Sequence, residues 1–194
     1  MRLVIQILTH AAAGAVALWL LDAMMRLEAG GAGVLALALA CLAAVLLGAI
    51  LSHLFHEWGH FLGALLGRSP LTLKARPAPL FFDVDYEQVQ PRQFLWLSWG
   101  GPLGNVLLIA VLSTGLPSAS LVYISAWAAS VAMFAYVLVL EGPISRGILA
   151  GGPPLRVLTE HFGQGVSLFK RAGLVGLSVL LASLLLGVLL LQGA

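Results

Sequence analysis

The sequence predicts an all-α polytopic membrane protein with about five transmembrane helices and a small insertion on the cytoplasmic side, either a β hairpin or a re-entrant segment. Three observations support this fold class. The 194 residues are 60% hydrophobic and only 9% charged, against about 25% charged in an ordinary soluble domain. The apolar residues form runs of about the 20 residues that a helix needs to cross hydrocarbon. The basic residues also gather on one side of the resulting topology.

The apolar runs define the expected spans within one integral membrane domain, residues 1–194. The first run has small residues, as a signal peptide does, but only one basic residue precedes it and a second span follows closely, so we expect a retained helix. The lone Cys41 lies inside an apolar run, where we expect it to pack. The expected spans are residues 3–21, 34–66, 94–116, 121–140 and 172–191.

Alternating these spans places nine of the ten basic residues on one side of the membrane and only Arg26 on the other. The positive-inside rule then predicts a cytoplasmic N-terminus and a C-terminus outside. The small size and the abundance of Ala, Leu and Gly favour a bacterial inner membrane, so the lipid bilayer is an expected partner. The net charge of +2 gives no indication of a nucleic-acid partner, and the sequence sets no oligomeric state.

A polar insertion at residues 71–90 interrupts the apolar pattern after the second span. Polar and apolar residues alternate over residues 71–74 and again over residues 82–87, with two prolines between them. This pattern predicts a hairpin or two short strands. The strands either cover the candidate site in the second span or pair by one edge with an extended segment of another protein.

The second span contains the sequence His56-Glu57-Trp58-Gly59-His60. Residues four apart share one face of a helix, so both imidazoles can bind one zinc ion while Glu57 reaches a metal-bound water. Zinc lowers the pKa of such a water towards about 7, and a carboxylate can then accept its proton. Ionisable side chains are costly within hydrocarbon, which favours a functional role over a buried hydrogen-bonded cluster without metal.

Two further features of this span concern its neighbours. His53 lies one turn before His56. Its role is that of a second-shell partner, a substitute ligand or a packed histidine, and the sequence leaves these alternatives open. Glycines at positions 59, 63 and 67 form a stripe that lets another helix approach closely.

A catalytic zinc ion commonly takes three protein ligands, so a third must come from another helix. Glu141, at the cytoplasmic end of the fourth span, is the favoured residue. At about 1.5 Å per residue, His60 lies about 12 Å before Arg68 and Glu141 about 8 Å before Arg146, which gives similar depths. The alternative is an interfacial carboxylate that pairs with Arg146.

The third span begins with two tryptophans, which suit the membrane interface, and continues as Gly100-Gly101-Pro102-Leu103-Gly104-Asn105. Pro102 lacks a backbone donor, so this segment can leave carbonyls free and direct Asn105 towards a polar cavity. Equally, Asn105 can satisfy neighbouring backbone groups.

Together, these residues resemble the site-2 protease family of intramembrane zinc metalloproteases. The resemblance rests on residues 56–61, on Gly101-Pro102-Leu103-Gly104-Asn105 and on Glu141-Gly142. It covers residues 34–150, and it implies a three-helix catalytic core with zinc ligands at His56 and His60, Glu57 as the base and Asn105 as a polar residue near the substrate or oxyanion. The family usually has Asp where this chain has Glu141, preceded by an Asn and several prolines that residues 133–140 lack.

The leading hypothesis is therefore an intramembrane zinc metalloprotease that hydrolyses a peptide bond in or beside a transmembrane helix of its protein substrate. One alternative is an inactive scaffold or pseudoprotease of the same fold. Another is a different membrane zincin, with Glu as third ligand, that cuts soluble or lipidated peptides. A transporter is poorly supported, because the sequence shows no paired halves.

Overall fold

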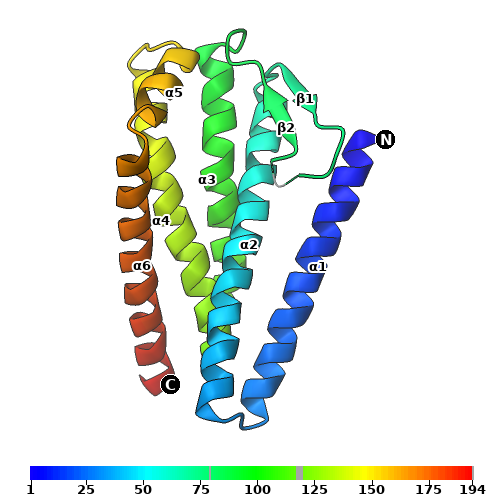
Figure 1. The fold of residues 1–194 in the computed structure, drawn as a ribbon, viewed down its shortest axis with the longest axis vertical. Helices are drawn as coiled ribbons and strands as arrows, with labels where there is room; N and C mark the ends of the chain where they lie inside the picture. The colour runs from blue at the N-terminus through cyan, green and yellow to red at the C-terminus, as the bar shows by residue number, and fades with distance from the viewer. Residues whose placement is uncertain (79, 117–119, 194) are drawn as a thin grey trace.

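The computed structural model describes residues 1–78, 80–116 and 120–193, and it shows six helices and a two-stranded sheet within these ranges (Figure 1). Five of the helices are long and apolar enough to cross a membrane. The predicted fold class is thus confirmed. The elements are α1 (Arg2–Ala29), α2 (Val34–Leu66), β1 (Leu71–Leu73), β2 (Phe82–Val84), α3 (Pro91–Ser113), α4 (Leu121–Leu149), α5 (Pro154–Phe162) and α6 (Val166–Gly193).

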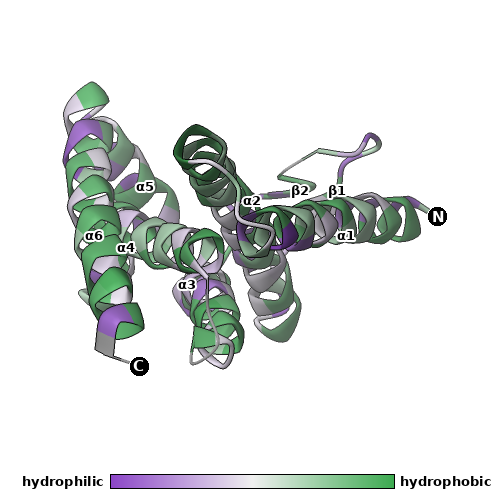
Figure 2. Cartoon of the chain, turned by 90° about the horizontal axis from the view of Figure 1, so that it is seen from below, coloured by the Kyte–Doolittle hydropathy of each residue, from purple (hydrophilic) through white to green (hydrophobic). Residues whose placement is uncertain are grey.

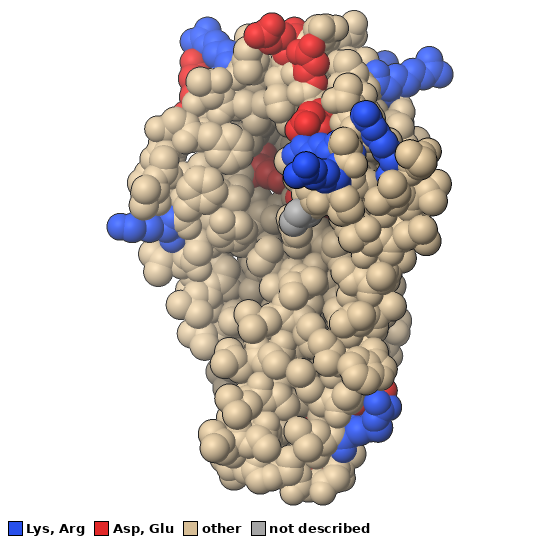
Figure 3. Space-filling model, turned by 45° about the vertical axis from the view of Figure 1, so that its right-hand side comes forward, with Lys and Arg blue, Asp and Glu red and all other residues tan. Residues whose placement is uncertain are grey.

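The helices expose an unusually apolar surface, as Figure 2 shows by hydropathy. Large aliphatic side chains such as Leu39, Leu103 and Leu185 are more than half exposed. In water such a surface would be strongly unfavourable, whereas in a bilayer it contacts lipid. The face in Figure 3 carries its Lys, Arg, Asp and Glu residues mainly towards one end, with a smaller group at the other end. The chain is therefore built as an integral membrane protein.

Helices α2, α3 and α4 pack against one another, α6 packs on α4, and α1 lies against α2 (Figure 1). A carboxylate from α1 also reaches the first turn of α4. The two oxygens of Glu28 accept hydrogen bonds from the backbone N–H groups of Leu121 (2.9 Å) and Val122 (3.1 Å). These donors lack partners within a helix, so Glu28 satisfies them and complements the positive end of the helix dipole.

The predicted glycine stripe brings α2 and α3 into backbone contact. A Cβ atom built on Gly59 would lie 2.1 Å from the carbonyl oxygen of Gly100, and one built on Gly63 would lie 2.1 Å from that of Trp96. From the α3 side, a Cβ atom on Gly104 would lie 2.2 Å from the carbonyl oxygen of Phe55. Small residues on both helices are therefore required for this close approach.

Replacing Gly59 by Ala is expected to lower the free energy of unfolding by about 1–3 kcal/mol, because the added methyl forces the two helices apart. Gly14→Ala is the matched control, since nothing lies within 4 Å of a Cβ atom at that position on α1. Thermal unfolding of both variants in the same detergent measures the effect. Equal stability of the two variants would contradict the backbone contact.

The insertion after α2 contains the predicted antiparallel pair, with Leu71 opposite Val84 and Leu73 opposite Phe82. The strands are shorter than the alternating stretches in the sequence. A hydrogen bond from the N–H of Lys74 to the carbonyl of Phe81 (2.9 Å) extends the pairing by one step. Phe81 and Phe82 are buried and anchor the sheet to the helical bundle.

The structure corrects the bounds of several spans. Helix α2 has the predicted limits, but α4 continues to Leu149 and α6 begins at Val166. Both additions contain basic residues, which an apolar window excludes and an α-helix tolerates. The segment after Gly152, which lies outside the expected spans, forms the short helix α5, which has Pro154 at its first position, where proline is favoured.

Candidate metal centre

Two imidazoles from α2 and one carboxylate from α4 meet inside the bundle. The Nε2 atoms of His56 and His60 lie 2.9 Å apart, and Oε1 of Glu141 lies 3.0 Å from the first and 3.2 Å from the second. His56 is buried, and His60 and Glu141 are partly buried. These three residues form a group that could hold a metal ion.

The sequence places each side chain of this group in a simple way. His56 and His60 are one helical turn apart on α2, so their rings share a face, with centroids 4.3 Å apart. Glu141 projects from α4, which is helical on both sides of this position. The alternative in which Glu141 pairs with Arg146 is not the arrangement found, because Arg146 is exposed and Glu141 contacts the two histidines.

Hydrogen bonds on the far side of each ring fix which nitrogen faces the group. Nδ1 of His56 donates to Oδ1 of Asn105 (2.9 Å), and Nδ1 of His60 donates to the carbonyl of Leu97 (2.7 Å). The amide of Asn105 is itself oriented, because its Nδ2 donates to the carbonyl (3.0 Å) and the hydroxyl (2.6 Å) of Ser52. Both Nε2 atoms are then left with a free lone pair, the state that binds a metal.

The side chain of Asn105 contacts two residues of α2. It is fully buried and does not line the site cavity. It connects Ser52 to His56, so it orients a ring of the candidate centre. Helix α3 runs through Pro102 without a break, and the carbonyl that reaches His60 is that of Leu97. Neither Ser52 nor the Leu97 carbonyl carried a signal in the sequence.

Gly101 makes room for both rings. A Cβ atom built on it would lie 2.5 Å from Cε1 of His56 and 2.5 Å from Cε1 of His60. Any side chain at this position would displace the imidazoles. The glycine before Pro102 therefore serves the centre directly, a role that the motif in the sequence did not reveal.

Glu57 lies beside the group and is 8% exposed. Its Oε2 atom is buried and accepts no hydrogen bond from the part of the chain that the structure describes. Its Oε1 atom lies 3.6 Å from Nδ1 of His53, which is beyond hydrogen-bond distance. His53 has a 41% exposed side chain and stands outside the group of three, so it is not a substitute ligand in this arrangement.

A cavity of about 320 Å³ opens onto these residues. Figure 3 shows a hollow below the charged end of the molecule with acidic atoms inside it. Besides His56, Glu57, His60 and Glu141, the lining residues come from the sheet region, α3, α4 and α5. They include Leu80, Phe82, Asp83, Val84, Tyr86, Phe94, Leu97, Ser98, Ile144, Leu158 and Phe162.

Tyr86 brings a hydroxyl to this cavity from outside the spanning helices. Burial raises the pKa of its phenol, and the negative charges of Glu141, Asp83 and Glu57 raise it further. The phenol therefore stays protonated at neutral pH and remains able to donate a hydrogen bond. The alternation in residues 82–87 predicted strands but gave no indication of this position at the site.

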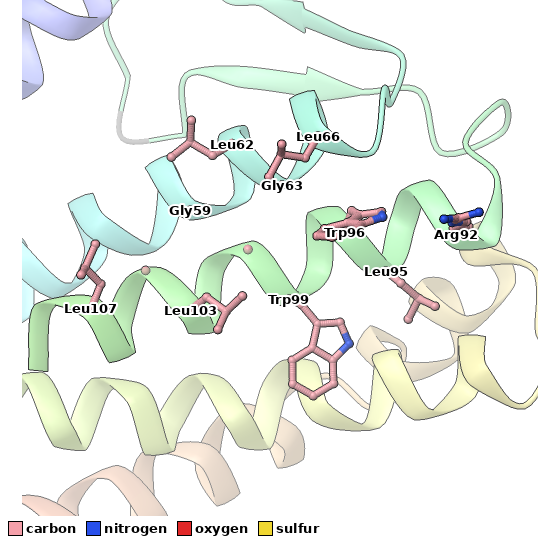
Figure 4. Close-up of a pocket in the computed structure, with 12 residues that line it drawn as sticks. Gly59, Leu62, Gly63, Leu66, Arg92, Leu95, Trp96, Trp99, Leu103 and Leu107 are labelled. Atoms are coloured by element: carbon pink, nitrogen blue, oxygen red, sulfur yellow. The ribbon is translucent and has the colours of Figure 1, made fainter. Parts of the chain in front are cut away.

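A second, larger groove of about 510 Å³ lies between α2 and α3, and Figure 4 shows it. Its walls are apolar, with Leu62 and Leu66 projecting from α2 and Trp96, Trp99 and Leu103 from α3. It shares no lining residue with the cavity at Glu57. Although it is larger than the cavity at Glu57, this groove is lined by none of the residues of the candidate centre.

Asn105→Leu is expected to weaken metal binding by about 10- to 100-fold, the usual cost of losing a second-shell partner. The variant removes the acceptor for His56 Nδ1 and leaves the ring free to rotate. Ser113→Ala is a control from the same helix, since that hydroxyl bonds within α3 and to Trp127. Competition with a metal-sensitive chelator measures the affinity. Unchanged affinity in Asn105→Leu would exclude the orienting role.

Comparisons with protein-family models, with curated proteins and with solved structures find no match to this chain.

Proposed function

We propose that this chain is an intramembrane zinc metalloprotease, which hydrolyses a peptide bond in or beside a transmembrane helix of its protein substrate. The observation that carries the proposal is the convergence of His56, His60 and Glu141 next to the unpartnered oxygen of Glu57. A structural cluster would pair all of its polar atoms. Here Oε2 of Glu57 and Oε2 of Glu141 are both buried without a hydrogen-bond partner in the described part of the chain, and both residues line the cavity.

The donor set suits zinc. Two imidazoles and one carboxylate are the protein ligands of a common class of catalytic zinc site, which leaves the fourth position open. In a tetrahedral site with zinc–ligand distances of 2.0–2.1 Å, ligand atoms lie about 3.3 Å apart, close to the 2.9, 3.0 and 3.2 Å found here. When bound, zinc supplies a Lewis acid that polarises a carbonyl and makes water more acidic.

The remaining steps fall to residues of the chain. Glu57 is within reach of the cavity and has a free oxygen to accept a proton from water and return it to the leaving amine. Asn105 and the Leu97 carbonyl hold the two imidazoles in position during these transfers. Tyr86 lines the cavity, and in this proposal its hydroxyl donates a hydrogen bond to a bound peptide.

The position and lining of the cavity favour a membrane-embedded substrate. Its walls are mostly aliphatic and aromatic, with contributions from β2 and from α5. A substrate helix must unwind locally before a peptide bond can react, because the backbone carbonyls of a regular helix accept hydrogen bonds within the helix. A cavity between a sheet edge and an amphipathic helix suits such an unwound segment. The bacterial inner membrane and the cytoplasmic N-terminus remain part of this proposal.

The test supplies purified protein in lipid nanodiscs with single-span substrates and with soluble peptides. Zinc content is measured by elemental analysis and the metal position by anomalous scattering at the zinc edge. We expect cleavage of the single-span substrate, loss of activity with a chelator and recovery with zinc. Cleavage of soluble peptides alone would indicate a different membrane zincin. A chain without zinc and without activity would support the scaffold alternative.

A further inference from the structure

We propose that Gln6 and His10 of α1 are positioning residues of the candidate site, which hold its cover in place. The cover segment comprises residues 74–78 and 80–81, between β1 and β2. This inference rests on the proposed function for its catalytic consequence, but its structural part stands on α1 and the cover segment alone. Neither residue touches the group of His56, His60 and Glu141.

One face of α1 carries a row of polar side chains directed at the backbone of the insertion. Nε2 of Gln6 donates to the carbonyl of Arg76 (2.9 Å) and lies 3.4 Å from that of Lys74. Nε2 of His10, one turn further along, lies 3.1 Å from the carbonyl of Ala78. Two side chains one helical turn apart on α1 thus reach the carbonyls of alternate residues, 74, 76 and 78, of an irregular segment.

Burial makes these contacts significant. Gln6 is 1% exposed and His10 is 8% exposed, although both lie in a helix that is otherwise largely open to lipid. Gln6 and His10 lie about 6 and 12 Å along the helix from Arg2. Irregular backbone at such depth is tolerated only where protein groups satisfy it. α1 provides the donors that the carbonyls of the cover segment need.

His10 also connects the cover segment to the helix of the candidate centre. The indole N–H of Trp58 donates to Nδ1 of His10 (3.1 Å). Because indole is a donor only, Nδ1 must accept, so Nε2 carries the proton and donates to Ala78. One imidazole therefore bridges the cover segment and the residue that follows Glu57.

The cover segment reaches the cavity wall through Leu80, and its last residue, Phe81, packs against α1 and α2. Phe81 is fully buried, with its ring centroid 5.2 Å from that of His10, 4.6 Å from Trp58 and 5.1 Å from Phe61. Phe82 follows directly and lines the cavity at Glu57. Loosening α1 from the cover segment would thus move the wall against which a substrate binds, while the metal ligands stay in place.

Two variants remove the donors with little change in size: Gln6→Met and His10→Phe. Thr9→Val is the matched control, because Thr9 is an exposed polar residue on the same turn and no hydrogen bond joins it to the cover segment. His10→Gln is the conservative rescue, since its amide can still donate to the Ala78 carbonyl. All are prepared as full chains in nanodiscs with zinc added.

The first readout is amide hydrogen exchange of the peptide that contains the cover segment. Loss of one hydrogen bond corresponds to roughly 1 kcal/mol, so we expect about fivefold faster exchange for each variant and up to about 30-fold for both together. Thr9→Val should match wild type, and zinc content should be unchanged in all. Unchanged exchange in the double variant would overturn the proposal, whether or not the protein proves to be a protease.

The second readout is cleavage of a single-span substrate. We expect KM to rise in Gln6→Met and His10→Phe with kcat much less affected, and His10→Gln to recover most of the loss. Equal KM values in all variants would overturn the positioning role. If wild type cleaves nothing while exchange responds as expected, the proposed function fails and the link between α1 and the cover segment stands.

Discussion

Glu57→Gln is expected to abolish peptide cleavage while leaving bound zinc at the wild-type level. The change keeps the size of the side chain and removes its ability to accept a proton. General acid–base groups contribute about 10²- to 10⁴-fold to rate. We therefore expect kcat to fall by at least about 100-fold. Glu57 lies outside the group of three possible ligands, which is why the metal should remain.

The control for this substitution is Glu160→Gln on α5. That carboxylate is exposed, does not line the cavity and pairs with Arg156 (2.7 Å). Its loss should leave kcat unchanged. Activity is measured with a single-span substrate in nanodiscs and zinc by elemental analysis. A Glu57→Gln chain that retains zinc and cleaves within about tenfold of wild type would remove Glu57 from the mechanism.

Glu141→Ala is expected to reduce zinc affinity by more than the roughly 10- to 100-fold that loss of a second-shell group costs. Its Oε1 atom lies 3.0 Å and 3.2 Å from the two Nε2 atoms, and Glu141 is the one carboxylate among the three residues of the group. Activity should fall in proportion to bound metal. Titration against a competing chelator gives the affinity, and Glu87→Gln, at an exposed position, is the control.

Glu141→Asp gives the sharper test of geometry. Helix α4 continues on both sides of this position, with Pro143 inside it, and on this backbone a side chain one methylene shorter withdraws from the two Nε2 atoms. We expect an intermediate loss of zinc affinity, although the resembling family uses Asp here. Full affinity in Glu141→Asp would show that α4 can move towards α2. Full affinity in Glu141→Ala would show that the third ligand lies elsewhere.

Much of the fold follows from composition, because a long apolar run has few alternatives to a membrane span. The limits of α2 were predicted correctly for this reason. Helix α5 was not predicted, because it is short and mixed in polarity. Its start at a proline was the signal that could have indicated it.

The candidate site was predictable where chemistry follows local spacing. His56, Glu57 and His60 share one helical turn, and Glu141 could be placed by depth. The supporting contacts were not predictable, because the Leu97 carbonyl and Ser52 carry no distinctive residue type. Gln6 and His10 did offer a signal, since two polar residues four apart within a span are costly unless they have partners.

The backbone contact between α2 and α3 has a consequence for inhibition. Gly59 and Gly100 contact each other and line the apolar groove of Figure 4, which shares no lining residue with the cavity at Glu57. Under the proposed function, a lipophilic compound that fills this groove would lie outside the cavity at Glu57 and would not compete with a peptide. A competitive inhibitor would have to approach from the opposite side, past the sheet and α5, and bring its own zinc-binding group.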